Sequence, residues 1–484
     1  MGCNFPHAPN LDTYWSLLET GGNGISHVPG ERWNSAYFME RGEIQTDWGG
    51  FLDNLKAFDA KFFQINPKAA KVLDPQQRLL FQVVWHALEN AGLDGLSLKD
   101  SKTGVYTGCA TGEYFHLLNR SLESDEVNAY IGIGNSYAAT SGRISYFLGT
   151  QGPALTVDTA CSSSMVAAHL GCRDLVAGAT DMAIISGTNM LLNPFGYISF
   201  SRAKMLAPDG RCKTFDKDAD GYVRSEGMGT IICKRYADAV QAGDRIWAVI
   251  HGTAVNQDGA GNGFTAPNGR AQVSLYSQTL EAAGKLAKDI DWIECHGTGT
   301  RLGDPIEVDS IQEVYGALRT TPLYISSVKT NIGHLEAAAG VASMIKVALS
   351  LKNRKIPGHR NFKQLNPFIK LNHNTKIPLT LLDMETSRTY QVGISSFGIT
   401  GTNSHMIMSE APEIQSTVLP HKHPAAQTME SRFPAPACGG RRLRSTACKG
   451  RTTPLVPLAS LDSPNQGRWV AFGSIVPGTI CCPL

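Results

Sequence analysis

Residues 153–170 read Pro-Ala-Leu-Thr-Val-Asp-Thr-Ala-Cys-Ser-Ser-Ser-Met-Val-Ala-Ala-His-Leu, and the setting of Cys161 makes this the most informative stretch of the chain. Its first five residues predict a short buried strand, and the small and apolar residues after Cys161 predict a helix. Cys161 is therefore expected at a strand-to-helix turn, where the helix dipole and free backbone N–H groups favour a thiolate. The pattern leaves two interpretations open, a reactive nucleophile or a buried structural cysteine.

Two histidines occupy similar positions later in the chain. His296 follows the apolar residues 292–295 and leads into Gly-Thr-Gly-Thr. His334 ends the sequence Lys-Thr-Asn-Ile-Gly-His, which follows the apolar stretch 323–328. Both are expected just past strand ends, where α/β folds carry their chemistry. A cysteine with two such histidines predicts a thioester-forming site, and the alternative is that both histidines are structural.

Strand-like and helix-like stretches alternate along much of the chain, which predicts a layered α/β fold. An amphipathic helix is predicted over 79–92. Further short strands are predicted at 104–107, 183–187, 230–233 and, opening a second half of the chain, 246–250.

The sequence around Cys161 resembles a known motif. Asp-Thr-Ala-Cys-Ser-Ser-Ser at 158–164 is similar to the nucleophile motif of the β-ketoacyl synthase family, in its polyketide synthase branch. Residues 296–300 and 329–334 resemble the two histidine motifs of that family, in the same order. Other blocks that resemble the family lie at 74–78, 209–216, 256–259 and 395–403. The chain is thus identified as a member, a ketosynthase of the type I polyketide synthase kind.

The resemblance implies a thiolase-like α/β fold with two similar halves in an α-β-α-β-α arrangement. It covers about residues 1–412, with the nucleophile half at about 1–240 and both histidine motifs in the half at about 241–412. From 413 to 484 Pro, Ser, Thr and Arg dominate, which predicts a disordered tail.

The activity implied by the resemblance is a decarboxylative Claisen condensation. Cys161 would accept an acyl group from a carrier-protein thioester. A malonyl-type extender would then lose carbon dioxide, and neutral His296 and His334 would donate N–H groups to the enolate oxygen. The backbone N–H groups of Cys161 and Ile399 would hold the tetrahedral oxyanion.

Supporting roles come from the same resemblance. Thr298 and Thr300 match threonines that contact the phosphopantetheine arm of the carrier. Lys329 matches a lysine that supports the electrostatics of the site and the placement of His334, and its alternative is a solvated surface lysine. The chain itself is expected to bind no cofactor, since its substrates are carried on phosphopantetheine.

Composition excludes several classes. The formal net charge is +2, from 44 basic and 42 acidic residues, so we expect no nucleic-acid or membrane partner. No apolar run approaches the roughly 18 residues of a membrane helix. The 11 cysteines form no Cys-x-x-Cys pair, which argues against a metal site, and their odd number favours a reducing cytoplasmic setting.

The expected partners are an acyl carrier protein and a second copy of the chain, because the family is generally homodimeric. No Gly-x-Ser-x-Gly nucleophile elbow occurs in the sequence, so an acyltransferase is expected in trans or in a larger assembly.

Two departures from the family bear on the structure. Relatives have a hydrophobic strand just upstream of the residues that match 1–6, so an exposed sheet edge is expected here. Ile399-Thr400 replaces the Phe-Gly of fatty-acid relatives, which indicates the polyketide branch.

Three other functions compete with this interpretation. A nicotinamide-dependent oxidoreductase fits poorly, because Gly297, Gly299 and Gly303 have the wrong spacing and Pro305 interrupts the helix. A non-condensing thiolase would use coenzyme A esters and lack the second histidine in this setting. A degenerate or scaffold-like ketosynthase would bind carrier protein without elongating chains.

Overall fold

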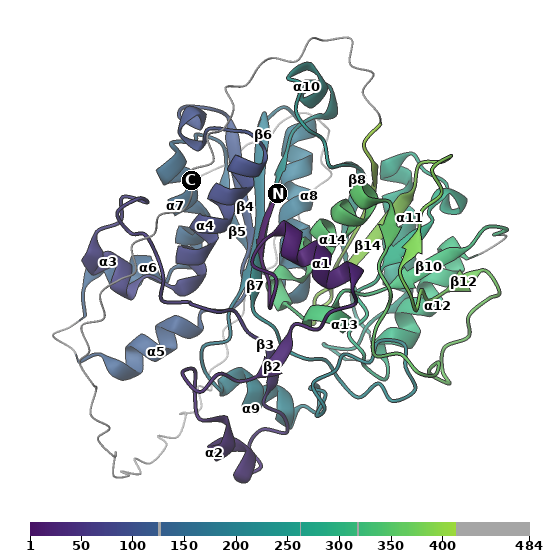
Figure 1. Cartoon of the computed structure of the whole chain (residues 1–484), viewed down its shortest axis with the longest axis horizontal. Helices are drawn as coiled ribbons and strands as arrows, with labels where there is room; N and C mark the ends of the chain where they lie inside the picture. The colour runs from purple at the N-terminus through teal and green to yellow at the C-terminus, as the bar shows by residue number, and fades with distance from the viewer. Residues whose placement is uncertain (124–126, 262, 317–318, 413–484) are drawn as a thin grey trace, which may run out of the picture. The chain divides into compact units, whose positions relative to one another are not determined.

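The computed structural model describes residues 1–412 apart from 124–126, 262 and 317–318. The predicted disordered tail, 413–484, lies outside the described residues. Two mixed sheets and two helices between them organise the described part (Figure 1).

The first sheet holds the strand that leads to Cys161. Its order is β1 (Gly2–Asn4), β7 (Gly227–Cys233), β6 (Met182–Asn189), β4 (Thr103–Gly108) and β5 (Ala154–Val157). β4 pairs in parallel with β5 and β6, and β7 runs antiparallel to β6 and β1. Every residue of β4 and β6 is buried, as continuous runs of apolar and small residues predict for strands covered on both faces.

The second sheet repeats the same topology. Its order is β12 (Thr375–Lys376), β10 (Leu323–Ser326), β9 (Trp292–Glu294), β14 (Gln391–Phe397), β15 (Thr402–Glu410) and β8 (Ala248–Gln257). The short edge strand β12 has no counterpart in the first sheet. Without it, the order β10-β9-β14-β15-β8 corresponds to β5-β4-β6-β7-β1, strand for strand and with matching directions. The expected division into two similar halves is therefore confirmed.

Helices complete the expected layers. α8 (Ser163–Val176) and α14 (Ala339–Asn353) contact strands of both sheets and so lie between them. α4 (Pro75–Asn90) and α7 (Tyr137–Leu148) pack on the first sheet, and α11 (Gly269–Ala283) packs on the second, with α12 (Gly303–Tyr315) against it. The order from one side to the other is α-β-α-β-α (Figure 1).

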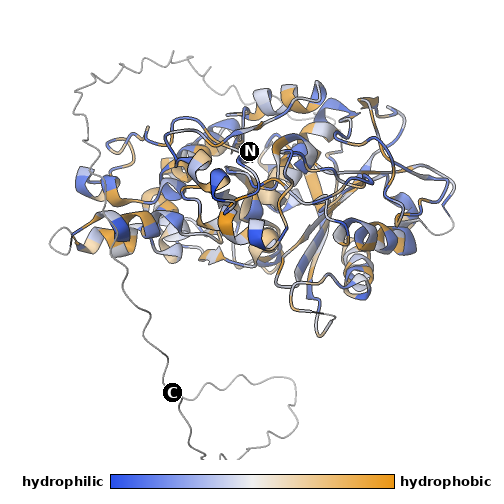
Figure 2. Cartoon of the chain, turned by 90° about the horizontal axis from the view of Figure 1, so that it is seen from below, coloured by the Kyte–Doolittle hydropathy of each residue, from blue (hydrophilic) through white to orange (hydrophobic). Residues whose placement is uncertain are grey.

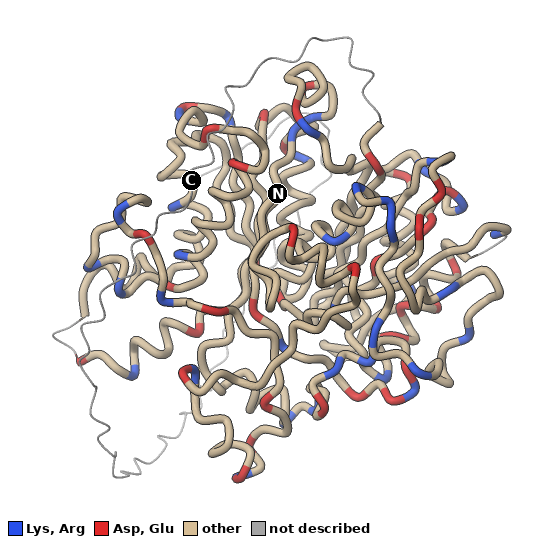
Figure 3. Tube along the Cα trace, in the orientation of Figure 1, with Lys and Arg blue, Asp and Glu red and all other residues tan. Residues whose placement is uncertain are grey.

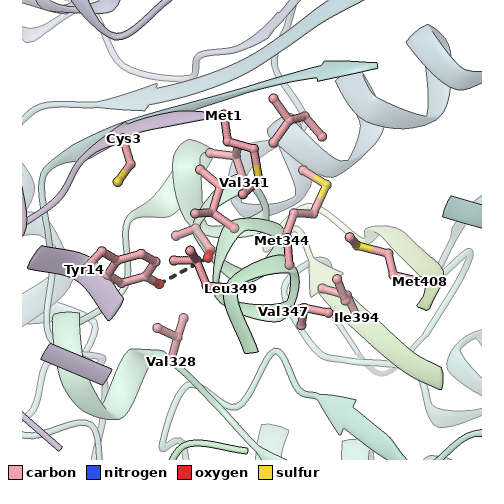
Figure 4. Packing of buried hydrophobic residues seen from close by; sticks show 14 of the residues in the cluster. Met1, Cys3, Tyr14, Val328, Val341, Met344, Val347, Leu349, Ile394 and Met408 are labelled. Atoms are coloured by element: carbon pink, nitrogen blue, oxygen red, sulfur yellow. Dashed lines mark hydrogen bonds between the residues drawn. The ribbon is translucent and has the colours of Figure 1, made fainter. Parts of the chain in front are cut away.

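The central helix α14 is buried at every position from Ala339 to Leu351. A helix that is buried on all sides must pack against neighbours on all sides, and strands of both sheets contact α14. Figure 4 shows Met344 of this helix close to Met408 of β15. The Tyr14 hydroxyl of α1 (Leu11–Glu19) donates a hydrogen bond to the Ala342 carbonyl at 3.2 Å.

Hydropathy and charge follow the layers. Hydrophobic residues gather on the strands and on the inward sides of the helices (Figure 2). Basic and acidic residues are interspersed over the outer loops and helices (Figure 3). None of the helices in the described residues has the length and hydropathy that a membrane crossing requires.

The remaining elements are short and connect or flank the layers. The helices among them are α2 (Ser35–Glu40), α3 (Pro67–Val72), α5 (Glu113–Ser121), α6 (Ala129–Gly134), α9 (Phe195–Arg202), α10 (Tyr236–Gln241) and α13 (Lys329–Ile332). The strands form two pairs, β2 (Ile25–His27) with β3 (Trp48–Gly50) and β11 (Lys355–Ile356) with β13 (Leu382–Asp383).

Two predictions about the first sheet need correction. β5 forms as predicted, but it is not buried, because it is the edge strand and pairs with β4 alone. The edge expected at the start of the chain is present, but a strand forms it. Residues 2–4 are β1, the last strand of the sheet, which pairs with Met228, Gly229 and Thr230 of β7.

Candidate active site

A tight turn between β5 and α8 presents Cys161. Ala160 adopts a left-handed backbone conformation, with a φ of +55°. The Asp158 carboxylate accepts the Ala160 N–H at 3.0 Å, and the Ser163 hydroxyl accepts the Thr159 N–H at 2.9 Å. These side-chain hydrogen bonds stabilise a turn that the backbone alone would disfavour.

Two glycines allow the chain to close around this turn. A Cβ at Gly108 would clash with the backbone of Ser164, so glycine there lets α8 begin directly against β4. A Cβ at Gly398 would clash with the carbonyl oxygen of Thr159. The loop after β14 thus reaches the nucleophile turn from the other half of the protein.

This close approach brings the predicted oxyanion-hole residues together. The backbone N–H groups of Ile399 and Cys161 both act on the Cys161 sulfur and lower the pKa of its thiol. The Ser396 hydroxyl donates to the Cys161 carbonyl at 2.8 Å and fastens β14 to the turn. Two backbone N–H groups directed at the same place form a site that can bind a negatively charged oxygen.

His296 and His334 lie together, with ring centroids 5.4 Å apart and ring planes at 85°. The Phe397 N–H donates to Nδ1 of His296 at 3.3 Å, and the Glu336 N–H donates to Nδ1 of His334 at 3.1 Å. An Nδ1 atom that accepts a hydrogen bond carries no proton, so each neutral ring carries its proton on Nε2. Both histidines are therefore N–H donors at Nε2.

The histidines are neutral near pH 7. Burial and the charge of Lys329 lower the pKa of His296 and of His334 well below the usual value for histidine. Lys329 is 2% exposed, which excludes a solvated surface lysine. Burial also lowers the pKa of Lys329, against the opposing influence of nearby carboxylates.

The expectation of a resting thiolate at Cys161 is wrong. Burial, reinforced by the Glu336 carboxylate, raises the pKa of the Cys161 thiol to about 12. Lys329 and the two backbone N–H groups lower the pKa, but they do not outweigh desolvation. The resting site therefore holds a neutral thiol beside two neutral imidazoles.

A raised pKa predicts a simple pH dependence for alkylation of Cys161. We expect the rate with iodoacetamide to rise roughly tenfold per pH unit from pH 6 to pH 9, because the thiolate fraction rises by that factor far below the pKa. Peptide mapping by mass spectrometry separates Cys161 from the other cysteines. A rate that levels off near pH 7 would show a resting thiolate instead.

The residues of the site differ in their exposure to solvent. Cys161, His296, Thr300 and Ile399 are partly exposed, whereas Lys329 and His334 are buried. Thr298 is also buried, and its hydroxyl lies 3.3 Å from that of Thr300. Cys161 and His296 are thus partly accessible from outside, whereas His334 is not.

Several buried carboxylates that hold the histidine loops were not predicted. Glu307 accepts the backbone N–H groups of His296 at 2.7 Å and Gly297 at 2.8 Å, and burial raises its pKa. Glu294 accepts the Val328 N–H and pairs with Lys346, both at 2.6 Å. Charged residues inside otherwise apolar elements were the signal in the sequence that these positions have a structural role.

Replacing Lys346 by methionine should destabilise the protein strongly. The change leaves the Glu294 carboxylate buried without its cation, which costs about 3–5 kcal/mol of unfolding free energy. The matched control is Lys355→Met, since Lys355 pairs with Glu19 at 2.7 Å but both side chains are about one third exposed. We expect that control to leave the midpoint of urea denaturation almost unchanged, because solvent screens an exposed pair. Equal effects of the two substitutions would contradict a structural role for the buried pair.

Known proteins share this fold and sequence. Residues 1–239 match the family model of the β-ketoacyl synthase N-terminal domain, and residues 247–363 match that of the C-terminal domain. Two of the phenolphthiocerol/phthiocerol polyketide synthase subunits of Mycobacterium tuberculosis are each 43% identical to the chain. The match covers 98% of this chain and 23% of the first of these proteins, and 86% of this chain and 27% of the second. The chain thus spans about a quarter of the length of these curated relatives.

Solved structures agree with the sequence matches. The ketosynthase from module 6 of the Bacillus subtilis bacillaene synthase superposes with a TM-score of 0.81 and 36% identity, over 86% of this chain and 72% of that one. An oxazolomycin ketosynthase domain from Streptomyces albus gives a TM-score of 0.80 and 35% identity, over 86% of this chain and 75% of that one.

Fold and site together define a thiolase-like acyltransferase that forms carbon–carbon bonds. The chain belongs to the β-ketoacyl synthase family, as a ketosynthase of the type I polyketide synthase kind. Its class of reaction is the Claisen condensation, and the comparisons do not favour a degenerate ketosynthase.

Proposed function

We propose that Cys161, His296 and His334 carry out the decarboxylative condensation of an acyl group with a malonyl-type extender on an acyl carrier protein. The observation that supports this proposal is that β14 joins groups from both halves: Ser396 donates to the Cys161 carbonyl, and the next residue, Phe397, donates to Nδ1 of His296. Cys161 follows β5 in the first half, while both histidines and Ile399 come from the second.

The first half-reaction is acyl transfer to Cys161. The sulfur attacks the thioester carbonyl of the acyl carrier, and a tetrahedral oxyanion forms that the N–H groups of Cys161 and Ile399 stabilise. The carbon–sulfur bond to the carrier then breaks. The proton of the Cys161 thiol ends on the departing phosphopantetheine thiol, so the exchange is balanced.

The second half-reaction begins with decarboxylation. The bond between the malonyl carboxylate and its neighbouring carbon breaks, carbon dioxide leaves, and the electron pair forms an enolate. The Nε2–H groups of His296 and His334 donate to the enolate oxygen. Neutral donors suit this task, because they stabilise the charge without protonating the carbon that must react.

Carbon–carbon bond formation completes the cycle. The enolate carbon attacks the acyl carbonyl on Cys161, and the same two backbone N–H groups receive the second oxyanion. The bond to the Cys161 sulfur breaks, and the thiolate takes up one proton from solvent. The raised pKa of Cys161 favours this protonation and returns the site to its resting state.

Supporting groups complete the proposal. Burial, reinforced by the Lys329 cation, keeps both imidazoles neutral. In this proposal Thr298 and Thr300 contact the phosphopantetheine arm. The partners of the chain would then be an acyl carrier protein and an acyltransferase, which acts in trans or belongs to a larger assembly. The free thiols of the described residues favour a reducing, cytoplasmic setting.

Acylation of Cys161 is the first step to measure. Incubation of the chain with a short acyl thioester, followed by intact mass and peptide mapping, should show one acyl group on Cys161. Acylation at another cysteine, or none, would refute the assignment of the nucleophile.

We also propose a homodimer through β5. This strand lies at the edge of the first sheet, and Leu155 on it is 42% exposed. An uncovered edge strand favours pairing with its own copy about a two-fold axis, which would join the first sheets of two chains.

Light scattering should give the parent protein twice the mass of the chain. Leu155→Asp should make the protein monomeric, because it places a charge on the paired edge of each copy. The control is Leu286→Asp, at a side chain that is 60% exposed and lies outside β5, and it should remain dimeric. A parent protein with the mass of one chain would contradict the dimer.

A further inference from the structure

A buried ion pair lies behind His334, and the reaction described above uses neither of its side chains. Arg224 is 1% exposed. Its Nε lies 2.6 Å from one oxygen of Glu336, and its Nη2 lies 3.1 Å from the other. This bidentate geometry is the one in which a guanidinium and a carboxylate offset their loss of water best.

The ion pair and His334 form one connected unit. The His334 N–H donates to the Val223 carbonyl at 2.7 Å, and the Ser225 N–H donates to the His334 carbonyl at 2.9 Å. His334 is therefore fastened to the residues on both sides of Arg224. Its ring is fastened to Glu336, whose N–H donates to Nδ1 at 3.1 Å.

Glu336 holds an unfavourable backbone conformation. Its φ is +48°, in the left-handed region that residues with a Cβ seldom adopt. Its N–H reaches Nδ1 of His334 from this conformation. Strain of this kind persists where surrounding contacts fix the residue, and the bidentate pair with Arg224 is such a contact.

Arg224 is itself fixed in place. A Cβ at Gly196 would clash with Nη1 of Arg224, so glycine leaves room for the guanidinium. The rings of Tyr197 and Phe200 lie 5.4 and 5.2 Å from the guanidinium carbon. The Glu113 carboxylate lies 3.6 Å from Nη2. Arg224 thus offers Glu336 a rigid anchor.

We propose that Arg224 and Glu336 are positioning residues for His334. Their ion pair holds Glu336 in the left-handed conformation, its N–H then fixes Nδ1 as an acceptor, and the proton stays on Nε2 toward the substrate. This inference rests on the proposed function, in which the Nε2–H of His334 stabilises the enolate.

The test compares two double variants that differ in one methyl group. Arg224→Met/Glu336→Gly and Arg224→Met/Glu336→Ala both remove the ion pair and leave no unpaired guanidinium. Glycine adopts a positive φ freely, whereas alanine does not. We expect the glycine variant to decarboxylate malonyl thioester about ten times faster than the alanine variant, with equal acylation of Cys161.

Nitrogen-15 NMR of His334 provides a second readout that does not depend on turnover. The parent and the glycine variant should show a proton on Nε2, and the alanine variant a mixture of both tautomers. Equal decarboxylation rates and equal spectra in the two variants would overturn the inference. If the parent shows the Nε2 tautomer but no decarboxylation, the proposed function fails while the positioning stands.

Discussion

Replacing Cys161 by alanine should abolish acyl transfer and spare decarboxylation. The variant has no sulfur to form a thioester, so we expect acylation to fall by at least about 10³-fold. The groups that stabilise the enolate, His296 and His334, remain in place, and their N–H groups act without the sulfur. The Cys161→Ala variant should therefore lose acyl transfer and keep decarboxylation.

Two assays measure this separation. Intact mass follows the acyl adduct, and release of carbon dioxide from malonyl thioester follows decarboxylation. Cys109→Ala is a matched control, because Cys109 is a buried thiol that follows β4 as Cys161 follows β5. An unchanged acylation rate in Cys161→Ala would overturn the nucleophile assignment.

Replacing His334 by alanine should block the second half-reaction. Removing one N–H donor to a developing oxyanion costs on the order of 10²–10³ in rate, so condensation and decarboxylation should fall by that factor. Acylation of Cys161 should change by less than about threefold, because the enolate forms only after it.

His334→Asn sharpens this prediction. Its side-chain amide is neutral at all accessible pH values and offers an N–H donor, so it should recover part of the rate that alanine loses. Circular dichroism checks that both variants fold. Equal losses in acylation and condensation would contradict a role of His334 confined to the enolate.

Local patterns in the sequence were enough to predict most strands near the site. β4 and β6 are buried on both faces, so their apolar runs identify them without knowledge of their neighbours. Cys161 and His296 follow strands closely, and the rule that chemistry lies past strand ends located both of them. The same rule predicted His334 just past a strand end, but α13 stands between His334 and β10.

Properties that depend on distant residues could not be predicted. The exposure of β5 follows from its place at the sheet edge, which its own sequence does not specify. The raised pKa of Cys161 results from burial under both halves and from Glu336, which is far along the chain. Arg224 and Glu336 are 112 residues apart in sequence, and no local pattern indicates their pairing.

β1 shows a further limit of local patterns. The open edge was predicted from the resemblance, because relatives have a strand just upstream. Three residues, Gly2 to Asn4, are too few for a strand signal of their own. In the structure they lie along β7 and against α4, which supply the hydrogen bonds and the packing.

The product of the complete reaction shows whether this chain catalyses condensation. The acylated chain should be mixed with malonyl carrier protein labelled with carbon-13, and the carrier-bound product analysed by mass spectrometry. We expect a β-ketoacyl group two carbons longer than the starter, with both added carbons labelled and Cys161 free again. Cys161 that stays acylated while the malonyl group remains unchanged, in a dimeric and folded protein, would contradict it.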